Sequence, residues 1–189
     1  MTYKLIIFDF DGVIVNPNSP VRNIIDIIDK LGILDINDRA EDLLKSFTNL
    51  AKSFTNLIES LLCVGQIFNP CGLVSFAERY SNYKSNDKVV NFIKNRNGYK
   101  MAIFSINTRR CIEKHLEEAG ILEKFDVVIS CEDVKKLKPN LEGLKKILKI
   151  TKVRPHEAIY FGSGDNDRIA AENAQIKYVS SLNNLKKVL

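Results

Sequence analysis

Residues 8–13 of this chain read Phe8-Asp9-Phe10-Asp11-Gly12-Val13, directly after a short apolar run that predicts a strand. In α/β sheets, ligands bind at the carboxyl ends of the strands, which is where this stretch falls. Two acids two residues apart in extended chain point the same way, and Gly12 allows a sharp turn after them. Because neighbouring carboxylates are costly unless a cation neutralises them, the stretch predicts a site for a hard metal such as magnesium. A solvated acidic turn is the alternative, but such a turn seldom follows a buried parallel strand.

Short apolar runs alternate with helical patterns in the second half of the chain. The strand-like runs are Met101–Ser105, Phe125–Ser130, Ala158–Gly162 and Lys177–Val179, and helices are expected over residues 108–119, 141–150 and 167–174. This alternation is typical of βα units on a mostly parallel sheet. We therefore predict an α/β fold.

The middle of the chain differs, because residues 20–97 contain almost no strand signal. Apolar residues recur there at spacings of three and four, notably from Leu43 to Leu61, which predicts helices. A seven-residue unit also repeats, once over residues 45–50 and again over residues 52–57. Two units are too few for a coiled coil, so a helix in a small bundle is favoured over a dimerising face.

The stretch at residues 8–13 resembles the first motif of the haloacid dehalogenase superfamily, and three further motifs of that family follow in order. They are Ile103-Phe104-Ser105, Leu137-Lys138-Pro139 and the acidic stretch at residues 160–167 with its alanine-rich helix. The four motifs together span the chain outside the central block. The resemblance implies a Rossmann-like parallel sheet flanked by helices, formed by residues 1–15 and 98–189. It also implies that residues 16–97 form an inserted α-helical cap domain, as in phosphoglycolate phosphatase-like members.

The resemblance further implies a magnesium-dependent phosphatase. Asp9 would be the nucleophile that becomes an aspartyl phosphate, and Asp11 the general acid and base. Ser105 and Lys138 would stabilise the transferred phosphoryl group. The predicted phosphate-binding residues are Gly12, Ser105, Ile106, Asn107 and Lys138.

The fourth motif departs from the family pattern in the residue that follows its glycine. Ser163 stands where the family usually has an aspartate, which is commonly a direct metal ligand. Asp165 or Asp167 could take over that contact. The predicted magnesium ligands are therefore Asp9, the backbone carbonyl of Asp11, and Asp165 or Asp167.

The leading functional hypothesis is hydrolysis of a small phosphomonoester, with phosphoglycolate as the default substrate. A sugar phosphomutase of the same superfamily is the near alternative. The change at Ser163 keeps open a third hypothesis, a catalytically weakened phosphate-binding or interaction protein.

Composition limits which binding partners and which cellular location we expect. Hydrophobic residues make up 45% and charged residues 27%, with a formal net charge of +5. No apolar run reaches the roughly 20 residues that cross a bilayer, and we expect a cytoplasmic protein without a membrane partner. The lysines come without aromatic interleaving, which disfavours nucleic-acid binding. We expect a small phosphorylated metabolite as partner, and a monomer or homodimer.

Overall fold

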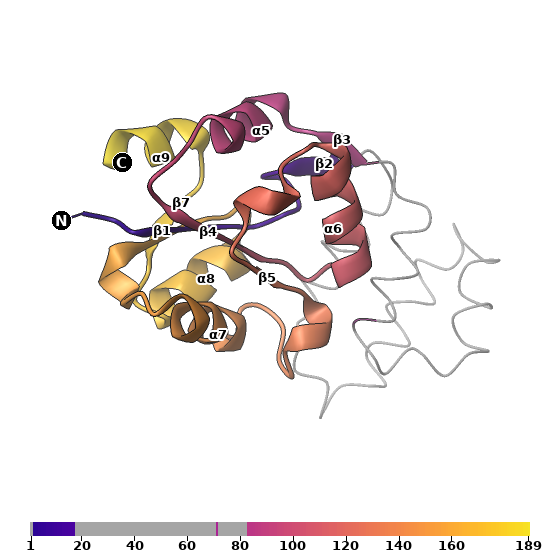
Figure 1. The fold of residues 1–189 in the computed structure, drawn as a ribbon. Helices are drawn as coiled ribbons and strands as arrows, with labels where there is room; N and C mark the ends of the chain where they lie inside the picture. Colours follow the sequence, from indigo (N-terminus) through magenta and orange to yellow (C-terminus); the bar gives the residue numbers. More distant parts are fainter. Residues whose placement is uncertain (1, 18–70, 72–82) are drawn as a thin grey trace, which may run out of the picture. The chain divides into compact units, whose positions relative to one another are not determined.

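The computed structural model describes residues 2–17, 71 and 83–189 (Figure 1). The chain divides into two compact units, residues 1–18 together with 82–189, and residues 19–81. All described residues except Cys71 belong to the first of these units. The predicted helical cap and the seven-residue repeat therefore lie, apart from the margins of the cap, outside the described residues.

A five-stranded parallel sheet forms the centre of the first unit (Figure 1). Its strands are β1 (Leu5–Phe8), β4 (Lys100–Phe104), β5 (Val127–Ile129), β6 (Ala158–Phe161) and β7 (Lys177–Val179). They stand in the order β5-β4-β1-β6-β7, so β1 is central and pairs with β4 and β6. The chain extends the sheet first on one side of β1 and then on the other, which places the topological switch point beside β1. The predicted parallel α/β sheet is confirmed.

Helices cover both faces of the sheet and bury both sides of its strands. They are α5 (Asp87–Lys94), α6 (Arg109–Glu118), α7 (Glu142–Thr151), α8 (Asp165–Asn173) and α9 (Leu182–Val188), with short 3-10 turns at Leu122–Lys124, Cys131–Asp133 and Pro155–Glu157. Along β1, Ile6 and Phe8 pack in one apolar cluster, and Leu5 and Ile7 in the other. Burial on both faces explains why the strand is apolar throughout rather than alternating.

The chain leaves the sheet through β2 (Val15–Pro17) and returns through β3 (Tyr83–Ser85), which pair antiparallel. Helix α5 follows, and its Val89, Val90 and Ile93 are buried in the same apolar cluster as β1 and β4. The units therefore divide at residues 18/19 and 81/82, whereas the sequence suggested boundaries at 15/16 and 97/98. Helical periodicity shows that α5 has an apolar face. It does not show which of the two units that face packs against.

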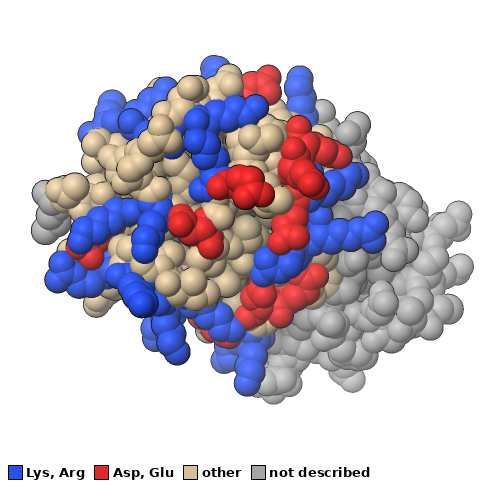
Figure 2. All heavy atoms as spheres, viewed as in Figure 1, with Lys and Arg blue, Asp and Glu red and all other residues tan. Residues whose placement is uncertain are grey.

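Figure 2 shows how charge is distributed on one face of this unit. On the face shown in Figure 2, Lys and Arg side chains lie at many separate places, with Asp and Glu among them. None of the described helices is both long and apolar enough to cross a membrane.

Gly143, near the start of α7, provides a test of the packing between this helix and the sheet. A Cβ at this position would lie 2.2 Å from Cε2 of the buried Phe104 ring. We expect Gly143→Ala to lower the free energy of unfolding by about 1–3 kcal/mol, because the added methyl group overpacks the core. The matched control is Gly164→Ala, where a Cβ meets nothing within 4 Å. Equal urea midpoints for the two variants would contradict the packing described.

Candidate active site

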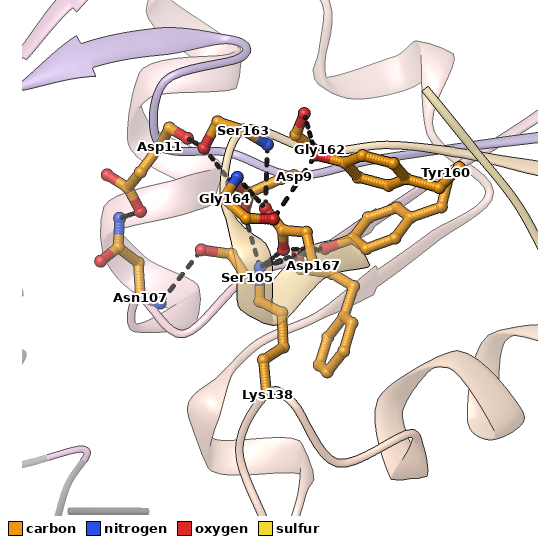
Figure 3. Close-up of polar contacts among 12 residues, drawn as sticks. Asp9, Asp11, Ser105, Asn107, Lys138, Tyr160, Gly162, Ser163, Gly164 and Asp167 are labelled. Atoms are coloured by element: carbon orange, nitrogen blue, oxygen red, sulfur yellow. Dashed lines mark hydrogen bonds and ion pairs between the residues drawn. The ribbon is translucent and has the colours of Figure 1, made fainter. Parts of the chain in front are cut away.

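Loops at the carboxyl ends of β1, β4 and β6, together with the β5–α7 loop, bring the predicted catalytic residues to one edge of the sheet (Figure 3). The Asp9 N–H donates to the Phe161 carbonyl at 2.8 Å, and the Ser105 N–H donates to the Ile129 carbonyl at 3.0 Å. These bonds continue the strand ladders by one residue, so both residues begin their loops in fixed positions. Ser105 is fully buried.

The Lys138 ammonium lies at the centre of this site and is buried. Its Nζ donates to Asp9 Oδ1 at 2.8 Å and to Asp167 Oδ1 at 2.7 Å. The Phe104 carbonyl and the Tyr160 hydroxyl lie 3.2 Å and 3.1 Å from the same nitrogen. Burial alone would lower the pKa of Lys138, but the charges of Asp167 and Asp9 outweigh it and raise that pKa above its ordinary value. The two carboxylates therefore stabilise the charged form of Lys138.

Asp167 has both carboxylate oxygens occupied by donors. Oδ1 accepts from Lys138 and from the Tyr160 hydroxyl at 2.6 Å, and Oδ2 accepts from the N–H groups of Ser163 and Gly164 at 2.9 Å and 3.2 Å. Burial alone would raise the pKa of Asp167, but the Lys138 charge and these hydrogen bonds hold it below its usual range. Asp167 thus anchors the start of α8 and the lysine.

Asp9 is in a different electrostatic state, although it is buried equally well. Its Oδ1 accepts from Lys138, while Oδ2 lies 3.2 Å from the Ser163 hydroxyl. Burial and the negative charge of Asp167 raise the pKa of Asp9 well above its usual value; Asp11 adds to this, and Lys138 opposes it. A further cation at Oδ2 would favour the ionised carboxylate.

Asp11 is held from two sides. Its Oδ2 accepts from the Asn107 side-chain amide at 2.8 Å, and its backbone carbonyl accepts from the Ser163 hydroxyl, also at 2.8 Å. Gly12 turns the chain next, with φ of 74°, and a Cβ there would lie 2.9 Å from Ser163 Cβ. Only glycine permits this close approach of the two loops. Ile106 is half-buried in the loop between β4 and α6.

Comparison with known proteins identifies the family. The model of haloacid dehalogenase-like hydrolases matches residues 6–180. The chain belongs to this family. The resemblance predicted from the four motifs is therefore confirmed, and with it the prediction of a hydrolase.

Individual members of the haloacid dehalogenase-like hydrolases are similar over nearly the whole chain. The pyrophosphatase PpaX of Bacillus cereus (strain B4264) is 28% identical over 183 residues, which are 94% of this chain and 82% of that protein. A hydrolase of the superfamily from Geobacter sulfurreducens has a TM-score of 0.62 at 19% identity, with both chains fully covered. YfnB of Bacillus subtilis, solved with bound magnesium, has a TM-score of 0.61 at 14% identity and covers 100% of this chain and 99% of its own. The two structures show the fold that this hydrolase shares.

Asp165 is the one predicted site acid that the hydrolase does not bring into the cluster. Its side chain is 86% exposed and pairs with Arg168, one turn further along α8, at 3.3 Å. Asp167 reaches the cluster, but as an acceptor for Lys138 and the loop N–H groups. The two acids that the sequence offered as metal ligands therefore lie in different surroundings.

Three side-chain groups make hydrogen bonds in the site that sequence reasoning missed. They are the hydroxyl of Tyr160, the side-chain amide of Asn107, and the hydroxyl of Ser163 on Asp9 and Asp11. A signal existed for Tyr160, because a tyrosine within a short buried strand must find a hydrogen-bond partner for its hydroxyl group. Nothing in the sequence indicates the partners of the other two.

The hydrogen bond from Tyr160 to Asp167 can be tested by stability. We expect Tyr160→Phe to lower the free energy of unfolding by about 1.5–3 kcal/mol, because it removes a buried donor to a charged group. Tyr178→Phe is the matched control, since that hydroxyl donates to the neutral Gly162 carbonyl at 3.2 Å. It should cost only about 0.5–1.5 kcal/mol. A larger loss in Tyr178→Phe, measured by urea unfolding, would contradict the role given to Tyr160.

Proposed function

We propose that this chain hydrolyses a small phosphomonoester in the presence of magnesium, through an aspartyl phosphate on Asp9. The observation that carries the proposal is the buried Lys138 ammonium, which lies 2.8 Å from the Asp9 carboxylate. The carboxylate of Asp11, two residues after Asp9, is held separately by Asn107. Two acids of one loop in different environments suit two different roles. An intact arrangement of this kind disfavours the alternative of a weakened phosphate-binding protein.

The proposed reaction has two steps. In the first, an oxygen of Asp9 attacks phosphorus, the bond to the leaving oxygen breaks, and Asp11 gives that oxygen a proton. In the second, Asp11 takes a proton from a water molecule that attacks the aspartyl phosphate, which releases inorganic phosphate and restores Asp9. Lys138 and Ser105 offer an ammonium and a hydroxyl group to the charge on the phosphoryl oxygens.

Oxygen atoms of Asp9, Asp11 and Ser163 lie close together, and their chemistry fits a magnesium ion. The Ser163 Oγ lies 3.2 Å from Asp9 Oδ2 and 2.8 Å from the Asp11 carbonyl, whereas no three carboxylates among the described residues bring oxygens within 4.8 Å of one another. We infer that Asp9, the Asp11 carbonyl and Ser163 hold the ion, with Asp167 acting through its hydrogen bonds. Magnesium accepts such a site with one or two carboxylates. When bound, it neutralises charge on the carboxylate and the phosphoryl group.

Family resemblance and similarity to relatives indicate the candidate substrates. Phosphoglycolate remains the default from the family resemblance. Similarity to PpaX adds pyrophosphate, which is a phosphoanhydride rather than a phosphomonoester. A phosphomutase would use the same first step and return the phosphoryl group to a bound sugar. A panel of these compounds and sugar phosphates separates the three, when it is assayed both for release of inorganic phosphate and for conversion of each sugar phosphate into its isomer.

The nucleophile is tested with p-nitrophenyl phosphate and magnesium. We expect Asp9→Asn to reduce turnover by at least about 10³-fold, because no aspartyl phosphate can form. EDTA should also remove most activity from the unaltered protein. Asp165→Asn is the matched control and should stay within about twofold, since the side chain of Asp165 is exposed and turned to Arg168. Turnover that survives Asp9→Asn would overturn the proposal.

Ser163 determines the charge of the metal site. Ser163→Asp should tighten magnesium binding by about tenfold, or 1.4 kcal/mol, because a carboxylate replaces a neutral hydroxyl beside the ion. Isothermal titration calorimetry of the protein without substrate measures this directly. An unchanged dissociation constant in Ser163→Asp would place the ion away from this side chain.

A further inference from the structure

Asn107 is the side chain through which the loop after β4 reaches the loop after β1. It is fully buried, and its Nδ2 donates to Asp11 Oδ2 at 2.8 Å (Figure 3). Its own backbone is fixed on both sides, since its N–H donates to Ser105 Oγ at 3.1 Å and its carbonyl accepts from the Cys131 N–H at 3.1 Å. A side chain on so constrained a backbone presents its amide at a defined place.

The Asn107 amide acts on Asp11, through the hydrogen bond to its Oδ2. Asp11 is only half-buried and lies on a loop, so its two side-chain torsions are not fixed by packing alone. A hydrogen bond to Oδ2 selects one orientation of the carboxylate. Proton transfer depends on such an orientation, because the acid must lie within hydrogen-bond reach of the leaving oxygen.

We propose that Asn107 is a positioning residue that orients Asp11 for proton transfer to the leaving group. The inference rests on the proposed function, in which Asp11 is the general acid. If Asn107 only supported the fold, its loss would lower kcat/KM by the same factor for every substrate.

Substrates with different leaving groups distinguish a positioning role of Asn107 from a structural one. An alkoxide is a poor leaving group that needs a proton as it departs, whereas p-nitrophenolate departs with little help. The kcat/KM value reports the steps up to release of the alcohol, and so excludes the later attack of water, where Asp11 acts on every substrate alike. We expect Asn107→Ala to lower kcat/KM by about 10- to 100-fold for an alkyl phosphate such as glycerol 3-phosphate. For p-nitrophenyl phosphate the loss should be at least about tenfold smaller, because only the part of the loss that comes from proton transfer depends on the leaving group.

A matched control is available on the same loop. Asn86 Nδ2 donates to the Val13 carbonyl at 3.0 Å, so Asn86→Ala also removes an amide hydrogen bond to this loop but leaves the Asp11 carboxylate untouched. It should lower kcat/KM for both substrates by the same small factor. Should Asn107→Ala fail to fold, Asn107→Ser fills part of the space and still removes the amide.

A double-mutant cycle completes the test. Once Asp11→Asn has removed the acid, adding Asn107→Ala should cost no further activity toward the alkyl phosphate. Equal losses on both substrates, or additive losses in the cycle, would overturn the positioning role while the proposed function stood. Turnover that survives Asp9→Asn would instead overturn the proposed function itself, so the two failures are distinguishable.

Discussion

The site depends on a single buried cation between two buried carboxylates. Lys138 bonds to Asp9 at 2.8 Å and to Asp167 at 2.7 Å, and all three side chains are at least nine-tenths buried. Removing one partner from such a cluster leaves an uncompensated charge in the interior, which is far costlier than losing an exposed ion pair. The loops after β1 and β6 and the loop before α7 are therefore held together by one set of charges.

Three acids in and beside this cluster have three different surroundings. Four donors bond to Asp167, so it remains a stable anion that anchors the lysine and α8. Asp9 accepts fewer hydrogen bonds, and in the proposed mechanism its carboxylate binds the magnesium ion and attacks phosphorus. The Asp11 carboxylate accepts from a neutral amide, that of Asn107. The surroundings of each carboxylate, rather than its residue type, determine what chemistry it can perform.

Much of this could be predicted from the sequence, because residues that directly follow short apolar strands must meet at one edge of a parallel sheet. That rule places Asp9, Asp11 and Ser105, and the family motif adds Lys138. The choice between Asp165 and Asp167 depended on where α8 begins. The sequence suggested a start at Asp167, whereas the helix starts at Asp165. Two residues along a helix turn a side chain by about 200°, so the two acids point to nearly opposite sides.

The hydrogen bonds to Asp11 link the loops of three adjacent strands. The hydroxyl of Ser163, after β6, donates to the backbone carbonyl of Asp11. The side-chain amide of Asn107, after β4, donates to the Asp11 carboxylate. Neither contact can be read from residue spacing, because each depends on the exact path of a loop. A serine at position 163 therefore does more than leave out a carboxylate. It ties the backbone carbonyl of Asp11, which would ligate the proposed magnesium ion, to the loop that bonds to Asp167.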